Sequence, residues 1–395
     1  MTERSFQCEV LSPLFLGGAD ARGAPPELRA PSIRGAMRYW YRALLGGSTL
    51  LDSHDLLPKL HLLESDLFGS TDQGGSLSTR LSQTSALPIE SYQKDPAMPD
   101  HEGKKKPTGK DYLLWSMGST GGKPGSPNFQ PARKYIKPSA KFKFVLSAQL
   151  QPDSIQKGTA AFWLLTNLGA LGARANRGAG SLQALTDDSP VSFKVCTSIP
   201  ELQSYLKQGI KECMSIVGDG NWRNISTTDQ PEFDILHPKV CDIWVVADGD
   251  NGWNTYLDAL NGLGNHFHDY RTHQNPNGKA DHDAVLRWFQ SKGKGPKINR
   301  PIFGLPFPFQ YSNNGIKDVI IHENSDRRAS PLHMHITKLK SGKYVGVLTL
   351  FKSRFLPKNV DLQLQKKKWT APVPSDYAFV TNFIKTFPVK EQVTL

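Results

Sequence analysis

Arginines at helical spacing predict an anion-binding surface near the N-terminus. Arg34, Arg38 and Arg42 are four residues apart in a stretch whose apolar residues recur at helical spacing, so they form a row on one helix. Arg22 and Arg29 precede this row in a loop. A guanidinium group presents a planar fork that matches phosphate, and several in a row suit a ligand whose charges repeat. The pattern therefore favours an extended polyanion.

The row has a second explanation. Arginines on a helix often form ion pairs with acidic residues of a neighbouring element, and such surface pairs contribute little to stability. Close to the row in sequence, only Asp20 and Glu27 are acidic. This local imbalance favours an external anion over an internal pair.

Asp20 follows Gly17 and Gly18 in the first loop and has two possible roles. A loop carboxylate can bind a metal ion or orient a 2′-hydroxyl during RNA cleavage. Aspartate in an irregular loop also commonly forms a turn or pairs with an arginine. The sequence leaves both roles open.

A glycine-rich segment at 172–181, GARANRGAGS, is the second candidate anion site. Its glycines permit positive φ and close backbone approach, while its arginines add charge beside exposed amides. It is not a Walker A motif, because no G-K-[ST] closes it, nor a dinucleotide fingerprint, because it follows a predicted helix. A simple flexible connection is the alternative. The predicted binding residues here are Arg174, Asn176, Arg177, Gly178 and Ser181.

Four further clusters are less specific. Histidines 266, 268, 273 and 282 occur with aspartates in a region predicted to be a polar loop, where solvated side chains are favoured over a metal site. We therefore predict neither a metal ion nor a cofactor. Basic runs at 104–106, 292–300 and 366–369 fit either a solvated surface or binding of single-stranded nucleic acid.

Composition restricts the class of partner. The chain has 395 residues, 48 Lys+Arg against 36 Asp+Glu, a net charge of +12 and a pI of about 9.4. Such a charge indicates an acidic partner, either nucleic acid or an anionic surface. No signal peptide opens the chain and no long apolar run could span a membrane, so we expect a cytoplasmic protein without a membrane partner. Four distant cysteines without C-x-x-C spacing argue against a zinc ribbon or a disulfide framework.

The predicted elements indicate an α+β protein with two modules. Strands at 6–16 and 141–150, helices around 33–45 and 158–171, and a strand from 182 follow the order of a ferredoxin-like (RRM-like) unit in residues 1–195. Residues 69–138, rich in Gly, Ser, Pro, Lys and Gln, are interpreted as a long insertion. A second module is predicted in 196–395 from a strand at 240–247, a helix at 284–290, an edge strand at 302–309, a hairpin over 334–352 and a helix at 375–385.

Several blocks together resemble the RAMP superfamily of CRISPR proteins, in particular its first-numbered Cmr-type subunits of type III effectors. They are 13–20 (PLFLGGAD), 26–40 (PELRAPSIRGAMRYW), the glycine-rich segment, 303–307 (FGLPF) and 327–332 (RRASPL). The resemblance implies two ferredoxin-like modules in a multi-subunit antiviral ribonucleoprotein. It also implies contact with guide RNA or the guide–target duplex near the guide 3′ end, so guide RNA, target RNA and other effector subunits are the expected partners.

The resemblance also assigns roles to single residues. Arg29, Arg34 and Arg38 match the family's basic surface, and Arg174 and Arg177 match its glycine-loop position. In related backbone subunits a loop aspartate cleaves target RNA, so an endoribonuclease that uses Asp20 is the alternative function. Our leading hypothesis is an RNA-binding subunit in which the arginines of the helix and of the glycine-rich segment converge on one groove.

Overall fold

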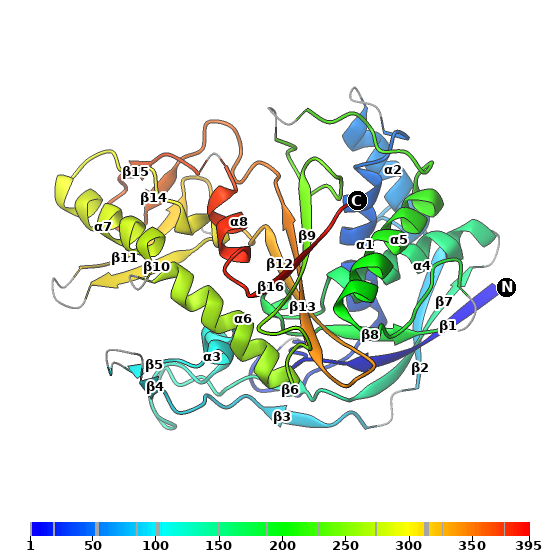
Figure 1. Cartoon of the computed structure of the whole chain (residues 1–395), viewed down its shortest axis with the longest axis horizontal. Helices are drawn as coiled ribbons and strands as arrows, with labels where there is room; N and C mark the ends of the chain where they lie inside the picture. The colour runs from blue at the N-terminus through cyan, green and yellow to red at the C-terminus, as the bar shows by residue number, and fades with distance from the viewer. Residues whose placement is uncertain are drawn as a thin grey trace.

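The chain adopts an α+β fold with three four-stranded antiparallel sheets, seen in a computed structural model (Figure 1). The structure describes residues 2–395 except 19, 52–54, 84–85, 100–102, 104, 149–150, 187–188, 227–229, 273–274, 312–315, 326 and 375. The mixed α+β class predicted from the sequence is confirmed.

The first sheet has the strand order β2-β7-β1-β8. Its strands are β1 (Thr2–Val10), β2 (Leu77–Gln83), β7 (Lys141–Ala148) and β8 (Leu182–Leu185). Helices α1 (Ala30–Leu45) and α4 (Pro152–Leu168) pack together on this sheet, and α2 (Leu56–Phe68) lies beside α1. Apolar residues alternate in β1 and β7, so the rings of Phe6 and Phe144 lie on the face that α4 covers. The ring centroid of Phe162 in α4 lies 4.8 Å from that of Phe6 and 4.7 Å from that of Phe144.

The range interpreted as an insertion supplies part of the first sheet. β2 lies within 69–138 and pairs with β7 as an outer strand, which its polar composition concealed. The rest of the range contains the short strands β3 (Ile89–Ser91), β4 (Met98–Pro99), β5 (Lys105–Lys106) and β6 (Lys134–Ile136), the helix α3 (Gly109–Leu113), and the 3-10 helix η1 (Trp115–Met117).

The second sheet has the order β12-β13-β9-β16 and lies beside the first. Its strands are β9 (Cys241–Ala247), β12 (Leu332–Lys338), β13 (Tyr344–Phe351) and β16 (Val389–Val393). The long α5 (Ile199–Val217) contacts α4 and β16, while α6 (Tyr256–Arg271) and α8 (Ala378–Ile384) accompany the second sheet. His266 and His268 lie on α6, and His282 lies on the later helix α7 (Pro276–Ser291), so the prediction of these three as loop residues was wrong. Polar residues and two glycines interrupt the apolar period of α6.

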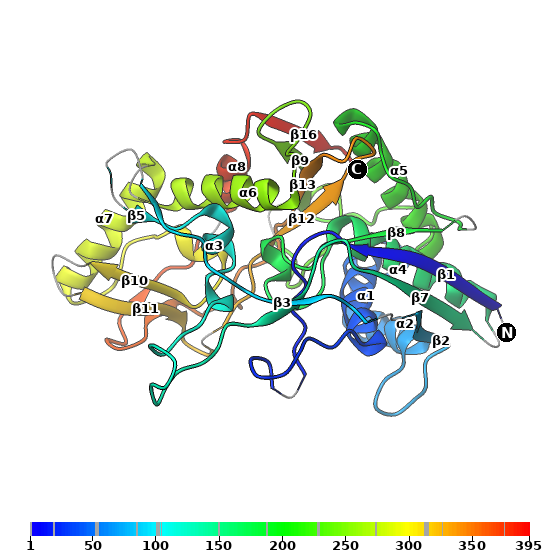
Figure 2. The ribbon, with the colours of Figure 1, turned by 90° about the horizontal axis from the view of Figure 1, so that it is seen from below.

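A third sheet forms one end of the molecule. It has the order β10-β11-β14-β15, with β10 (Phe307–Tyr311), β11 (Ile316–His322), β14 (Leu362–Leu364) and β15 (Thr370–Ala371). Helix α7 (Pro276–Ser291) and the 3-10 helix η3 (Arg300–Phe303) lead into it. Figure 2 shows α3 between this sheet and the first one.

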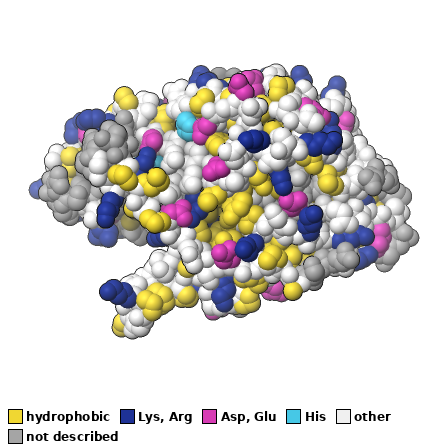
Figure 3. All heavy atoms as spheres, turned by 60° about the horizontal axis from the view of Figure 1, so that its bottom comes forward, with side chains coloured by type: hydrophobic (Ala, Val, Ile, Leu, Met, Phe, Trp, Pro, Cys, Tyr) yellow, Lys and Arg dark blue, Asp and Glu magenta, His cyan; other side chains and the backbone are white. Residues whose placement is uncertain are grey.

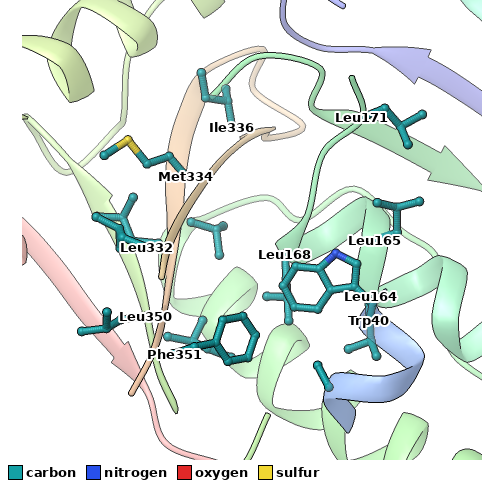
Figure 4. Packing of buried hydrophobic residues seen from close by; sticks show 14 of the residues in the cluster. Trp40, Leu164, Leu165, Leu168, Leu171, Leu332, Met334, Ile336, Leu350 and Phe351 are labelled. Atoms are coloured by element: carbon teal, nitrogen blue, oxygen red, sulfur yellow. The ribbon is translucent and has the colours of Figure 1, made fainter. Parts of the chain in front are cut away.

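One continuous core joins the first two sheets. Trp40 of α1 and the C-terminal half of α4 face β12 and β13 across an apolar layer (Figure 4). Buried polar contacts cross the same layer: Nδ1 of His335 lies 2.7 Å from the carbonyl oxygen of Gly169, which follows α4, and His333 stacks on Tyr39 of α1. The two sheets are therefore fixed relative to each other.

The buried histidines of this layer predict a pH dependence of stability. Burial lowers the pKa of His333 and of His335 from 6.5 to about 4, so the folded chain keeps both rings neutral. The unfolded chain takes up protons below about pH 6.5, which favours unfolding. We expect each ring to contribute on the order of 3 kcal/mol that is present above pH 6.5 and lost as the pH falls to 4, at 1.36 kcal/mol per pKa unit.

Denaturant unfolding between pH 7 and pH 5 measures this effect. His335→Gln should make the free energy of unfolding depend less steeply on pH over that interval. His61→Gln, at an exposed position on α2, is the matched control. Equal slopes for His335→Gln and wild type would contradict the assignment.

Candidate nucleic-acid interface

A basic cleft of about 810 Å³ lies where the first sheet, the second sheet and the third sheet meet. It is bounded by the glycine-rich segment, α3, the end of α6 and the segments 303–308 and 328–330. Five arginines line it, and none of the described lining residues is an aspartate or glutamate. These arginines are Arg174, Arg177, Arg271, Arg300 and Arg328.

The glycine-rich segment has a defined conformation in this cleft. Arg174 (φ 64°) and Gly178 (φ 80°) adopt left-handed conformations on either side of the 3-10 helix η2 (Ala175–Arg177). The N–H of Gly178 donates to the carbonyl oxygen of Met334 in β12 (3.0 Å), and a Cβ at Gly172 would lie 2.3 Å from the carbonyl oxygen of Phe15. The segment is thus wedged between the two sheets, which explains its need for glycine.

Arg174 and Arg177 are held by neutral oxygen atoms. The Nε of Arg174 donates to the carbonyl oxygen of Leu113 (2.7 Å). Arg177 donates to the Ser330 hydroxyl (3.0 Å) and to the carbonyl oxygen of Phe303 (2.5 Å). Burial and the nearby Arg271 lower the pKa of Arg174 to about 10, and burial with Arg174 and Arg271 lowers that of Arg177 well below its ordinary value. Positive charge concentrated in this way favours the approach of an anion.

Aromatic rings accompany these charges. The guanidinium carbon of Arg271 lies 4.6 Å from the ring centroid of Phe267 and 5.5 Å from that of Phe303, and its buried Nε has no hydrogen-bond partner among the described residues. Trp115, at the rim, has 55% of its surface exposed. Phe267 and Phe303 are buried, so of these rings only Trp115 is open to stack on a base, and cations beside such a ring suit single-stranded nucleic acid.

The arginine row on α1 lies elsewhere and has an acidic partner. The Nε of Arg38 lies 2.5 Å from Oε1 of Glu64, and Nη1 of Arg42 lies 2.7 Å from the same oxygen. Glu64 belongs to α2, a helix that the sequence analysis did not predict, and its side chain is only 7% exposed. The prediction that this row and the glycine-rich segment share one groove was therefore wrong, because none of the row lines the cleft. Glu64 offsets one of the positive charges of the row.

The other arginines predicted near the N-terminus differ in their partners. Arg34 is half-buried and makes no ion pair with any described residue, whereas Arg29 lies 3.8 Å from Glu27 with both side chains exposed. Arg22 donates to three backbone carbonyl oxygens of the 116–131 region, those of Ser116, Gly118 and Pro131, at 2.8–3.0 Å. Arg22 thus anchors the polypeptide that follows α3.

Asp20 forms a turn. Its Oδ1 accepts the backbone N–H groups of Arg22 (2.9 Å) and Gly23 (2.8 Å), and these hydrogen bonds lower the pKa of the exposed carboxyl group. Asp20 does not line the cleft. The turn-forming role, one of the two that the sequence left open, accounts for every hydrogen bond found at this side chain.

The remaining predicted residues of the glycine-rich segment have structural contacts. The Asn176 amide donates to the carbonyl oxygen of Ser330 (3.1 Å). Ser181 is fully buried: its hydroxyl accepts the N–H of Ile336 (3.0 Å), and its own N–H donates to Ser12 Oγ (2.9 Å). The serine therefore helps to join the two sheets and faces away from the cleft.

Three of the cleft arginines were not predicted as site residues. Arg328 lies in the block 327–332, and Phe303 begins the block 303–307, so the family resemblance contained a signal for that wall. Arg300 ends the basic run 292–300, whereas Arg271 has no local signal, because it joins the cleft only through folding of α6 against η3.

The histidines give no metal centre. His266 pairs with Asp248 (2.8 Å) and His268 with Asp269 (2.8 Å), and the described part of the chain contains no group of three or more His, Cys, Asp or Glu suited to a metal ion. His273 of the predicted cluster and Lys104 of the first lysine run lie outside the described residues. No described helix combines the length and the apolar character needed to cross a membrane.

Comparison with known proteins defines the class. The RAMP superfamily model matches residues 7–183. Two proteins of Pyrococcus furiosus are similar: CRISPR system Cmr subunit Cmr1-1, 26% identical over 336 residues (84% of this chain, 82% of the relative), and Cmr1-2, 30% identical over 185 residues (46% and 95%). The crystal structure of apo Cmr1 from the same organism shares the fold, with a TM-score of 0.57 at 21% identity, covering 100% of this chain and 99% of that one.

The chain therefore belongs to the Cmr1 family of CRISPR subunits within the RAMP superfamily, which confirms the resemblance inferred from the sequence blocks.

The two roles considered for Asp20 can be separated by substitution. Asn keeps an oxygen acceptor at the same place, so Asp20→Asn should preserve the turn, RNA binding and any RNA cleavage by the assembled complex. Asp20→Ala loses the two hydrogen bonds and should lower the midpoint temperature of unfolding slightly. Gel analysis of target RNA and thermal unfolding provide the two readouts. Loss of a cleavage product in Asp20→Asn, with binding intact, would make the carboxylate catalytic.

Proposed function

We propose that this protein is an RNA-binding subunit of a cytoplasmic type III CRISPR interference ribonucleoprotein and that the basic cleft is its RNA contact. The observation that carries the proposal is a cleft lined by aromatic rings and five arginines, three of which (Arg174, Arg177 and Arg271) form no ion pair with a described carboxylate. Arg300 and Arg328 pair with Asp281 (3.9 Å) and Asp234 (4.0 Å), which lie outside the lining. The names of the relatives, which are subunits of Cmr systems, support assembly with other effector subunits.

The fold supports a division into two ferredoxin-like modules, residues 1–195 and 196–395. We number the four strands of each of the first two sheets from 1 to 4 in chain order. In both sheets the strands then lie side by side in the order 2-3-1-4, and all neighbours are antiparallel. A helix follows the first strand and another the third, α1 and α4 in one case and α6 and α8 in the other. This is the β-α-β-β-α-β arrangement of ferredoxin-like proteins. The cleft lies where the two units meet.

The cleft is suited to the RNA backbone more than to base sequence. Guanidinium groups bind phosphate oxygens, and rings such as Trp115 stack on any base. In an RNA-guided complex, sequence is read by base pairing while the protein holds the backbone. We therefore propose contact with the guide RNA, the target RNA or both, near the guide 3′ end, in antiviral defence.

The endoribonuclease alternative has no observation of its own in this structure. Asp20 is engaged in a turn outside the cleft. RNA binding without catalysis at Asp20 is the function that the geometry supports best.

Arg271 provides the sharpest test, because its guanidinium stacks on rings and leaves Nε without an acceptor. Arg271→Met keeps an unbranched side chain of similar length and removes the charge. We expect weaker binding of single-stranded RNA at every sequence, roughly tenfold at low salt, with the slope of log K against log[salt] reduced by about 0.7. Fluorescence anisotropy across a salt titration measures both quantities.

Arg80→Met is the matched control, since Arg80 lies on β2 away from the cleft and pairs with Glu3. It should leave the slope near that of the wild-type protein. If Arg271→Met binds RNA as the control does, the cleft is not the RNA site.

A further inference from the structure

A second cationic surface lies at the end of the molecule formed by α7 and the third sheet. We call it the lysine tip and define it by six exposed residues: Lys292, Lys294, Lys317, Lys366, Lys367 and Lys368. Figure 3 shows Lys and Arg side chains gathering at this end. None of the six lines the basic cleft, so the lysine tip is a separate surface.

Folding brings the lysine tip together from three distant segments. The N–H of Gly295 donates to the carbonyl oxygen of Thr370 (2.7 Å), which joins the 292–297 run to the 366–368 run. Nζ of Lys366 lies 3.4 Å from the carbonyl oxygen of Lys317 on β11, which adds the third segment. Like charges assembled in this way repel one another, so the surface gains from an external anion.

Internal acids do not neutralise the lysine tip. None of its six lysines forms an ion pair within the described part of the chain, whereas the neighbouring Lys297 pairs with Asp376 at 3.1 Å. Asp318 lies beneath the lysines but is buried, and its Oδ1 accepts the backbone N–H of Lys366 (3.1 Å). The six lysines of the tip therefore keep their positive charges.

Two half-exposed rings accompany the lysines. Phe289 of α7 and Trp369 pack edge to face with centroids 5.9 Å apart, and Nζ of Lys367 lies 5.8 Å and 6.0 Å from the two centroids. Basic side chains beside accessible rings are again the combination suited to a single nucleic-acid strand.

The third sheet links the lysine tip to the cleft. In the β10–β11 pair, Pro308 of the cleft wall lies opposite Val319, and Gln310 lies opposite Lys317. Side chains two residues apart share a face of a sheet, so Lys317 lies on the same face as Pro308, about 7 Å along it at 3.3 Å per residue. A strand that leaves the cleft along β10 and β11 would reach the lysine tip within a few nucleotides.

We infer that the lysine tip is a second RNA-backbone site, which holds the single strand that extends from the cleft. This inference rests on the RNA-binding function proposed above and adds the direction in which the strand runs. An acidic protein surface is the competing occupant. RNA is favoured because the lysine tip continues from a cleft with the same combination of cations and rings.

The test compares two charge-matched double variants of the full-length protein. Lys366→Ala with Lys367→Ala removes two contacts from the lysine tip. Lys207→Ala with Lys211→Ala removes two exposed lysines from α5, at the other end of the molecule (Figure 1). With a 20-nucleotide single-stranded RNA, the lysine-tip variant should lower the slope of log K against log[salt] by about 1.4, at 0.7 per contact, and the control should not.

Including Arg271→Met in the same titration separates the two proposals. If Arg271→Met weakens binding while the lysine-tip variant matches the α5 control, the cleft stands and the lysine-tip inference is overturned. If neither variant changes binding, both proposals fail. If the lysine-tip variant binds RNA normally but no longer copurifies with the other effector subunits, the occupant is an acidic protein and the RNA inference is overturned.

Discussion

The cleft depends on arginines whose hydrogen-bond donors are satisfied by neutral oxygen atoms. Arg174 and Arg177 donate to carbonyl oxygens of Leu113 and Phe303 and to the hydroxyl of Ser330. A carbonyl oxygen fixes the orientation of a guanidinium group and leaves its net charge in place. A carboxylate fixes the orientation and also offsets the charge. Glu64 acts in this second way on Arg38 and Arg42 of α1 and offsets one of their two positive charges. The two sets therefore differ in the acceptor: Arg174 and Arg177 keep both charges for an external anion, whereas the α1 row has one of its charges offset by Glu64.

The core between the first two sheets stabilises the fold enough to hold the crowded arginines of the cleft. Crowding cations in a buried site raises the free energy of the folded state, which shows in the lowered pKa of Arg177. The cost is offset by the apolar layer in which Trp40 and α4 pack on β12 and β13, and by Ser181 and His335, which satisfy backbone groups across it. The cleft arginines contribute charge, and the neighbouring core contributes rigidity.

Much of the first sheet could be predicted from the sequence, and the cleft could be predicted only in part. Alternation in 141–148 and the apolar period of α1 identified their elements, because a single solvated face leaves a clear pattern. β2 and α6 escaped because polar residues and glycines interrupt their periods. Arg174 and Arg177 were found through their glycine context. Glu64 and Arg271 were not, since their significance arises only when α2 meets α1 and when α6 meets η3.

The same reasoning explains why a row of arginines on a helix is weaker evidence than arginines in a glycine-rich segment. A regular helix exposes its side chains to any neighbouring helix, and a single glutamate such as Glu64 can reach two successive turns. A segment with left-handed residues, such as Arg174 and Gly178, presents backbone carbonyl and N–H groups in unusual directions, and nearby chain segments meet them with backbone groups of their own. Side chains that project from such a segment are consequently surrounded by neutral acceptors. Backbone irregularity, more than arginine spacing, is what keeps the positive charge available for a polyanion.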